Sequence, residues 1–261
     1  MRMKRFLAFG LAMVMACSSL MLGCSDSSKS SNKVIVGVDN GFPPMGFLND
    51  KNELVGFDID VAKATFAKLG MQVEFLAIDW SAKEQELNTK KVDCLWNGYT
   101  ITDERKEKVN FTDPYMKNAQ VIVVKKDSGI ASLKDMAGKK LALQSGSSAA
   151  DALDAAADLK ASLGKVNEFG DNMKAFMDLE SGMSDAVLLD QVVADYYIKT
   201  NNKDWVILDE KLAQEEYGIG FRKDDALRDK VNNTLKELAA DGTLAKISTE
   251  WFGSDVTIIG K

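Results

Sequence analysis

Three positions far apart in the chain carry groups that could hold a small zwitterion. Arg105 lies in the run TITDER, the turn Gly146-Ser147-Ser148 precedes a helical segment, and Asp190 ends the run AVLLD. A guanidinium is planar and permanently charged, so its fork can pair with a carboxylate through two parallel hydrogen bonds. A buried aspartate can pair with an ammonium group, and a hydroxyl-rich turn at a helix start offers backbone N–H groups to an anion. The three positions therefore predict recognition of the two charged ends of a free α-amino acid.

Each of these features also has a purely structural alternative. Arg105 belongs to the charged run DERKEK, which is typical of a solvated helix face. Asp190 could cap the helix that follows its strand, and a GSS turn alone is a weak signal. An acid at the carboxyl end of a strand in an open α/β sheet nevertheless faces the crevice where ligands bind. Capping and binding by Asp190 are compatible.

The composition excludes several classes of protein. The 261 residues include no histidine, so Ser-His-Asp and Cys-His mechanisms are impossible and a catalytic zinc site is not expected. The chain has 33 basic and 39 acidic residues, a net charge of −6. Residues 1–23 contain three of the bases and no acid, so removing them leaves 30 bases against 39 acids, or −9. This balance argues against nucleic acid as a partner, because binding phosphate requires a basic face.

The N-terminus has the pattern of a secretion signal. Arg2, Lys4 and Arg5 come first, and the apolar stretch over 6–16 that follows is too short to span a bilayer as a helix. We therefore predict a signal peptide over residues 1–23, which places the mature protein outside the cytoplasmic membrane.

The end of this leader predicts a lipid anchor. The run MLGC, ending at Cys24, resembles a bacterial lipobox, in which the cysteine is diacylated and becomes the mature N-terminus. The segment ending at Cys17 also fits, but the polar run SDSSKSSNK follows Cys24 and reads as a tether over residues 24–32. We therefore predict lipidation at Cys24, with an unmodified secreted protein as the alternative. Cys94 has no partner, so we expect no internal disulfide and a small buried side chain.

Beyond residue 33, short apolar strands alternate with amphipathic helices, the pattern of an α/β fold. One helix should begin after Thr102, an N-cap residue, and another at the capping box Ser81-x-x-Glu84. Extended segments near 119–124 and 216–221 are candidates for crossings between two lobes. The predicted strands cover residues 34–38, 72–76, 92–96, 119–124, 141–143, 166–169, 186–189 and 217–221, and the main helices cover 57–69, 226–240 and 244–251.

Four segments together are characteristic of one protein family. VDNGFPPMGF, ELVGFDIDVAKA, WNGYTITDERKEKVNFTDPY and ADGTLAKISTEWFG resemble the polar amino-acid family of ABC-transporter substrate-binding proteins, which is solute-binding protein family 3. The likeness covers residues 33–254. It implies a periplasmic-binding-protein fold, in which two α/β lobes joined by two crossover strands close on a ligand like a hinged trap. On this fold, lobe 1 comprises residues 33–118 and 216–261, and lobe 2 comprises residues 119–215.

The resemblance also implies roles for the residues noted above. Arg105 would pair with the α-carboxylate of the ligand, helped by backbone N–H groups at Thr100 and Ser148. Asp190 would take the α-ammonium, with the Gly98 carbonyl and the Thr100 hydroxyl as further acceptors.

Three more residues would surround the ligand side chain. Phe42 and Trp80 would enclose it, and Asp39 would meet its polar end. The two prolines that follow Phe42 forbid a helix and present its ring on a loop. Trp80 could instead be a hydrophobic staple of the next helix, and Asp39 could be an ordinary turn residue.

The chain departs from the family pattern at two places. Asn97 and Gly98 stand where serine or threonine is frequent, and the GSS turn stands where Gly-Thr-Thr is usual. Serine keeps the hydroxyl of threonine, so we expect binding to survive. Asn97 and its neighbour Tyr99 could alter which ligand side chain fits.

The sequence therefore predicts a lipid-anchored, extracytoplasmic, monomeric receptor for a polar L-amino acid, which it delivers to an ABC permease. A separate ATPase subunit must drive the permease, because this chain has no phosphate-binding loop. Basic amino acids are favoured because Asp39 adds a carboxylate to Asp190, while glutamine and cystine stay open. No catalytic residue, cofactor or metal is predicted. The alternatives are a sensory amino-acid-binding module and a cyclohexadienyl-dehydratase-like enzyme on the same fold, which would need one of these acids as proton donor.

Overall fold

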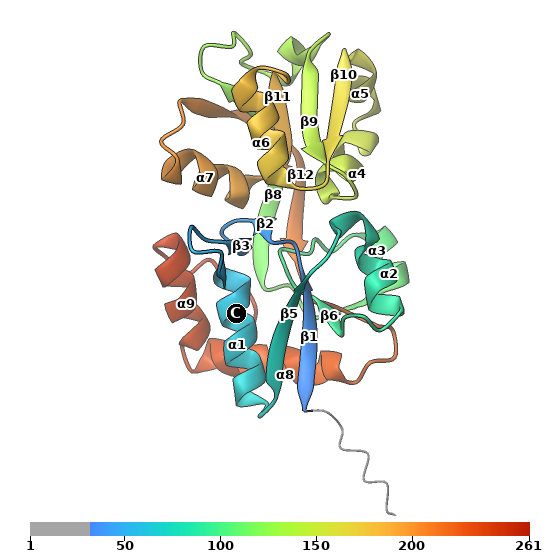
Figure 1. Ribbon diagram of the computed structural model, residues 1–261, viewed down its shortest axis with the longest axis vertical. Helices are drawn as coiled ribbons and strands as arrows, with labels where there is room; N and C mark the ends of the chain where they lie inside the picture. Colours follow the sequence, from blue (N-terminus) through green and yellow to red (C-terminus); the bar gives the residue numbers. More distant parts are fainter. Residues whose placement is uncertain (1–31) are drawn as a thin grey trace, which may run out of the picture. The chain divides into compact units, whose positions relative to one another are not determined.

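The computed structural model of the protein describes residues 32–261. The predicted signal peptide, the lipid attachment at Cys24 and nearly all of the predicted tether lie outside the described residues. Figure 1 shows the mixed α/β architecture, with two five-stranded sheets that define two lobes. Within residues 32–261 no helix combines the length and the apolar character needed to cross a membrane.

The sheet of lobe 1 has the strand order β5-β1-β6-β13-β7. β1 (Lys33–Val38) lies between β5 (Gln72–Ala77) and β6 (Cys94–Leu95), and these three strands are parallel. The short strand β13 (Gly220–Phe221) runs antiparallel to both β6 and β7 (Asn110–Phe111). Cys94 is a fully buried free thiol, as predicted.

Helices cover this sheet on both sides (Figure 1). The first helix buries an apolar stripe, since Ile59, Ala62 and Phe66 are all fully buried. One side carries α1 (Phe57–Lys68) and α9 (Thr243–Phe252), which pack together with α8 (Leu227–Ala240), and the other carries α2 (Lys83–Asn88) and α3 (Asp103–Lys108).

The sheet of lobe 2 has the order β10-β9-β11-β8-β12. Its parallel strands end at the edge that faces lobe 1, and each is followed there by a helix or turn (Figure 1). The strands are β9 (Lys140–Gln144), β10 (Lys165–Phe169) and β11 (Ala186–Asp190), and the helical elements are η2 (Leu133–Met136), α4 (Ser148–Ala155), α5 (Ala157–Ser162), α6 (Asn172–Ser181) and α7 (Gln191–Thr200).

Two long antiparallel strands connect the lobes (Figure 1). They are β8 (Met116–Lys125) and β12 (Trp205–Tyr217), and their pairing extends from Trp205↔Lys125 to Tyr217↔Met116. The first predicted crossing lies within β8. The second was expected near 216–221, but the observed crossing strand begins 11 residues earlier and ends at Tyr217. The residue boundaries given above for the two lobes stay a prediction.

Local capping signals explain where two helices begin. The Thr102 hydroxyl accepts a hydrogen bond from the Arg105 N–H at 3.1 Å, so the predicted N-cap of α3 is confirmed. The capping box predicted at Ser81 is wrong. Asp79 instead accepts from the Ser81 N–H at 2.9 Å and starts the short helix η1 (Trp80–Ala82). Glu84 is unavailable because its carboxylate accepts a hydrogen bond from the Tyr99 hydroxyl at 2.8 Å.

A three-stranded antiparallel sheet precedes α1 and ends at a constrained glycine. Its strands are β2 (Gly41–Phe42), β3 (Gly46–Leu48) and β4 (Leu54–Val55). Gly56 follows with φ 144° and ψ 166°, a conformation essentially restricted to glycine, and a Cβ there would overlap the Met45 carbonyl.

Gly56→Ala is therefore expected to lower the free energy of unfolding by about 3 kcal/mol, from backbone strain plus steric overlap. Urea denaturation of both proteins measures this difference. Gly70→Ala is the matched control, because Gly70 also has positive φ, at 68°, but has open space around it. It should cost only about 1 kcal/mol. Equal losses in the two variants would contradict the steric argument.

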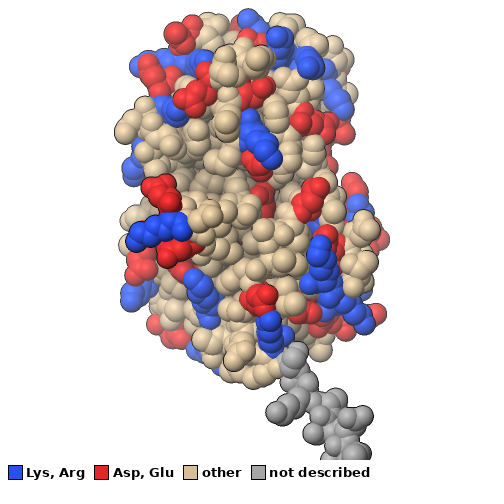
Figure 2. Space-filling model, in the orientation of Figure 1, with Lys and Arg blue, Asp and Glu red and all other residues tan. Residues whose placement is uncertain are grey.

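Charged side chains of both signs are interspersed over the surface seen in Figure 2. No continuous basic area covers this face, and such an area is what binding to a phosphate backbone requires.

Candidate functional site

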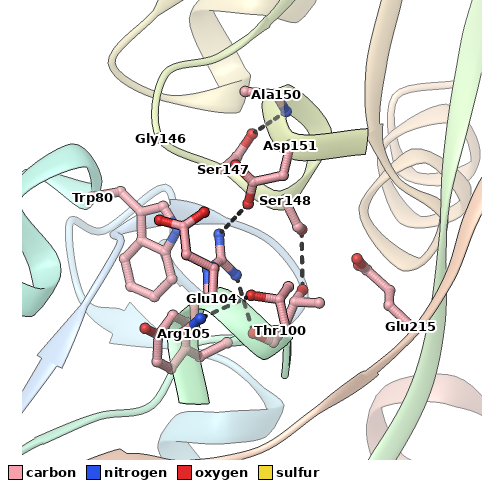
Figure 3. Close-up of polar contacts among 12 residues, drawn as sticks. Trp80, Thr100, Glu104, Arg105, Gly146, Ser147, Ser148, Ala150, Asp151 and Glu215 are labelled. Atoms are coloured by element: carbon pink, nitrogen blue, oxygen red, sulfur yellow. Dashed lines mark hydrogen bonds and ion pairs between the residues drawn. The ribbon is translucent and has the colours of Figure 1, made fainter. Parts of the chain in front are cut away.

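Arg105 is held between the two lobes. Its side chain is 6% exposed, Nη1 donates to the Thr100 carbonyl at 3.1 Å, and Nη2 donates to Asp151 Oδ2 at 3.3 Å (Figure 3). The guanidinium carbon lies 5.1 Å from the centre of the Tyr99 ring. Asp151 belongs to α4 of lobe 2, so this ion pair joins the lobes. Arg105 is therefore buried, whereas the other residues of the charged run DERKEK are exposed to solvent.

A second buried cation, Lys83, accompanies Arg105. Lys83 Nζ donates to the Gly146 carbonyl of the GSS turn at 2.8 Å and lies 5.5 Å from the centre of the Trp80 ring. Burial, together with the neighbouring positive charge of Arg105, lowers the pKa of Lys83 to about 8. Sequence reasoning missed this residue, because nothing in the local run SAKE distinguishes Lys83 from a surface lysine.

The two serines of the GSS turn have different partners. Ser147 is the N-cap of α4, where its hydroxyl accepts from the Ala150 N–H at 3.4 Å and donates to the Gln144 carbonyl at 2.7 Å. The Ser148 hydroxyl lies 3.0 Å from the Thr100 hydroxyl of lobe 1 (Figure 3). The predicted helix start is therefore confirmed, and Ser148 is the serine that meets the opposite lobe.

Asp190 lies at the carboxyl end of β11 and is 3% exposed. It occupies the N-cap position of α7, but its side chain makes no capping hydrogen bond. Its Oδ1 instead accepts from Asn118 Nδ2 at 2.7 Å and from the Tyr217 hydroxyl at 2.6 Å. Burial raises the pKa of Asp190 well above its usual range, and repulsion from the Glu215 carboxylate raises it further. The structure therefore does not support the capping alternative.

Asp39 also connects the lobes. Its Oδ1 accepts from the Gly41 N–H at 2.8 Å, and its Oδ2 accepts from Gln144 Nε2 of lobe 2 at 2.6 Å. Burial raises the pKa of Asp39, although the hydrogen bond from Gln144 opposes this shift. The hydrogen bond from Gly41 is the local contact expected of a turn residue. The hydrogen bond from Gln144 joins residues 105 positions apart in the sequence.

The two aromatic side chains lie in different apolar clusters. The Phe42 ring covers Gly98, where an added Cβ would lie 2.6 Å from Phe42 Cε1. The Trp80 ring meets the Tyr99 ring edge to face, with centres 5.7 Å apart. Both aromatic rings are buried, at 5% and 6% exposure.

The segment between β6 and α3 presents Asn97 and Gly98. Asn97 is 1% exposed, and within residues 32–261 neither of its side-chain polar atoms has a hydrogen-bond partner. The Gly98 N–H donates to Asp58 Oδ2 at 2.7 Å, so its orientation is fixed by a buried carboxylate from α1. Sequence reasoning missed Asp58, although it belongs to the quoted run GFDID.

A hydrogen-bonded path links four of the ten predicted site residues, Thr100, Arg105, Ser148 and Asp190. The side-chain amides of Asn118 and Gln120, both on β8, complete this path. The two residues alternate in the run NAQ, which places both side chains on one face of the strand and could have identified them in the sequence. In order, the path runs through Asp190, Asn118, Glu215, Gln120, Ser148, Thr100, Arg105 and Asp151. Among the described residues no three potential metal ligands are grouped together.

This chain is similar to known proteins over most of its length. Residues 34–254 match the family model described as bacterial extracellular solute-binding proteins, family 3. The chain is 35% identical to the arginine-binding extracellular protein ArtP of Bacillus subtilis, over 96% of this chain and 98% of that protein. It is 30% identical to the L-cystine-binding protein TcyJ of Escherichia coli, over 90% of this chain and 88% of that protein.

The fold is similar to that of a solved structure from Streptococcus pneumoniae. That structure is an ABC uptake transporter substrate-binding protein with bound histidine, 40% identical in sequence. The TM-score is 0.85, and the alignment covers 87% of this chain and 95% of that chain.

Proposed function

This chain belongs to the bacterial extracellular solute-binding proteins of family 3, and we propose that it captures a free polar L-amino acid between its two lobes for an ABC importer. One observation carries the proposal: a buried guanidinium of lobe 1 and a buried carboxylate of lobe 2, Arg105 and Asp190, lie at positions joined by one hydrogen-bonded path. A zwitterion presents one group of opposite charge to each.

In this proposal the carboxylate end of the ligand binds at Arg105. The guanidinium would pair with it, and the backbone N–H groups of Thr100 and Ser148 would donate to its oxygens. Ser148 opens α4, where unpaired N–H groups favour an anion. Asp151 would then have to share or release Arg105, because both carboxylates compete for the same N–H donors.

The ammonium end binds at Asp190, with the Gly98 carbonyl and the Thr100 hydroxyl as further acceptors. Asp190 is buried and repelled by Glu215, so a cation beside it relieves both desolvation and repulsion. Phe42, Trp80 and Asn97 would border the ligand side chain, Asp39 would accept from its polar end, and Ser147 would hold the turn in place.

A basic amino acid is the favoured ligand. Asp39 and Asp190 give the site two buried carboxylates, and cations also bind favourably over aromatic faces. The similar proteins include one named for arginine and one solved with histidine. Glutamine and cystine are the alternative ligands. Cystine is supported by the similarity to the L-cystine-binding protein TcyJ.

We further propose that the protein works as a monomer anchored to the membrane by a lipid on Cys24. It would deliver its ligand to a membrane permease driven by a separate ATPase. Metabolic labelling with a fatty acid, in the wild type and in Cys24→Ala, tests the anchor, and Cys17→Ala is the matched control.

A thermal-shift panel tests the proposed ligand class. The purified protein is unfolded and refolded to remove carried-over ligand, then mixed with each common amino acid and with cystine. A ligand at about a thousand times its dissociation constant adds roughly 4 kcal/mol to stability, which raises Tm by several degrees. We expect the largest shifts with arginine, lysine or histidine. A shift with glutamine or cystine alone would keep the receptor and contradict the preference for cations, and no shift with any amino acid would contradict capture.

The raised pKa of Asp190 also suits a second function. A buried carboxyl group whose pKa is raised keeps its proton to a higher pH than an exposed one and could donate it, as a cyclohexadienyl-dehydratase-like enzyme requires. Adding prephenate to the same protein and following phenylpyruvate by absorbance tests this alternative directly.

A further inference from the structure

A second carboxylate lies beside Asp190 that sequence reasoning did not identify. Glu215 is on β12, directly opposite Asn118 of β8. Its Oε1 accepts from Asn118 Nδ2 at 2.6 Å, and the same Nδ2 donates to Asp190 Oδ1 at 2.7 Å. The two carboxylates therefore share one N–H₂ group and lie close together. Figure 3 shows the Glu215 carboxylate turned toward Ser148.

A buried acceptor without a partner completes this group. Gln120 is fully buried, and its Nε2 donates to Glu215 Oε1 at 2.8 Å and to the Ser148 hydroxyl at 3.1 Å. Within residues 32–261 its Oε1 has no hydrogen-bond partner. An unpaired buried acceptor costs about 1–3 kcal/mol, so the native protein is expected to satisfy it in some other way.

Among the described residues, Asp190 and Glu215 have no direct cationic partner, although Lys106 and Lys117 line the same surface hollow as Glu215. No lysine or arginine among residues 32–261 forms an ion pair with Asp190 or Glu215. Two carboxylates and an amide carbonyl thus offer three acceptors, while an ammonium group offers three donors and one positive charge. A small ammonium matches this set in number of hydrogen bonds and in sign of charge.

We propose that Glu215 is a second carboxylate of the ammonium subsite, so that Glu215 and the Gln120 carbonyl hold the ligand ammonium beside Asp190, in place of the Gly98 carbonyl and the Thr100 hydroxyl. This inference rests on the proposed function, since it deepens the role given to Asp190. It makes Glu215 a specificity-determining residue. A ligand that lacks the α-ammonium would leave two neighbouring carboxylates desolvated without a counter-charge.

Isothermal titration of L-arginine and of its 2-hydroxy analogue into the wild type and Glu215→Gln tests the proposal. Glutamine keeps the size and one acceptor oxygen of Glu215 but removes the charge. We expect Glu215→Gln to weaken L-arginine binding at least tenfold, as for loss of a charged hydrogen bond. The hydroxy analogue should bind the variant as well as it binds the wild type, or better, because it has no ammonium.

Glu216→Gln is the matched control. It removes the same charge from the next residue of β12, which points to the opposite face of the strand and lies opposite Lys117. It should change the affinity for L-arginine less than twofold. Circular dichroism of the unliganded variants shows that each is folded, and Glu215→Asp, which keeps the charge, should retain more L-arginine binding than Glu215→Gln.

Each contrary result has a separate meaning. If Glu215→Gln binds L-arginine as the wild type does, Glu215 only orients the two amides and the inference is wrong. If the variant loses the hydroxy analogue equally, Glu215 faces the guanidinium end and the inference is again wrong. If the wild type binds neither L-arginine nor any other amino acid in the thermal-shift panel, the proposed function itself fails. If it binds another amino acid, that amino acid and its hydroxy analogue replace the pair.

Discussion

Arg105→Ala is expected to weaken amino-acid binding by about 3–5 kcal/mol, the cost of leaving one partner of a buried ion pair without the other. The guanidinium is almost fully buried and is oriented by the Thr100 carbonyl, so little of its charge is screened by solvent. Without it, the ligand carboxylate would be desolvated on closure with only backbone N–H groups as donors. Titration calorimetry with the ligand found in the thermal-shift panel measures the loss.

Two further variants separate charge from geometry at this position. Lys106→Ala removes a cation from the same helix. Because the Lys106 side chain is 56% exposed and pairs with Asp103, this variant should bind the amino acid as tightly as the wild type does. Arg105→Lys keeps the charge and loses the fork, and should fall between Arg105→Ala and the wild type. An affinity for Arg105→Ala close to that of the wild type would place the carboxylate subsite elsewhere.

The second large effect concerns pH. Asp58 is fully buried, its Oδ2 accepts from the Gly98 N–H at 2.7 Å and from the Tyr115 hydroxyl at 2.9 Å, and its Oδ1 has no partner within residues 32–261. Burial raises the pKa of Asp58 from 3.8 to about 7. Between these values the folded protein holds a proton that the unfolded chain has released. Stability must therefore fall as the pH rises through this window, by about 4 kcal/mol in total for this group.

Asp58→Asn should remove this part of the pH dependence. The amide keeps an acceptor for the Gly98 N–H and carries no charge at any pH. Urea denaturation at intervals from pH 4 to pH 8 should give the variant a shallower fall in stability than the wild type, so that it gains on the wild type toward pH 8. Asp50→Asn, at an exposed position, is the control and should follow the wild-type profile. Parallel profiles for Asp58→Asn and the wild type would show that Asp58 is ionised in the folded protein.

Local signals in the sequence predicted the elements well, and distant contacts account for the errors. The alternation of strands and helices, the N-cap at Thr102 and the helix start at Ser147 depend on neighbouring residues, and the structure has all of them. The capping box at Ser81 failed because Glu84 bonds Tyr99, 15 residues away. No local pattern reports such a contact.

The same distinction holds for the candidate site. Arg105 and Asp190 were identified because a family motif and a strand end mark them. The residues that contact the Asp190 side chain come from β8 and β12. Asn118 lies 72 positions before Asp190 in the sequence, and Tyr217 lies 27 positions after it. Glu215 stands in the run QEEY, where the sequence gives no reason to separate it from the neighbouring Glu216.

The strands that connect the lobes also form one wall of the proposed site. Asn118, Gln120, Glu215 and Tyr217 all lie on β8 or β12, in the part of the ribbon nearest lobe 1. In the proposed site, a substitution at Gln120 or Glu215 would change a ligand contact and the hydrogen bonds between the crossing strands together. On this proposal, ligand preference and the open–closed balance of the empty receptor are not independently adjustable. A designed or evolved change of ligand at these positions will also change how readily the receptor closes.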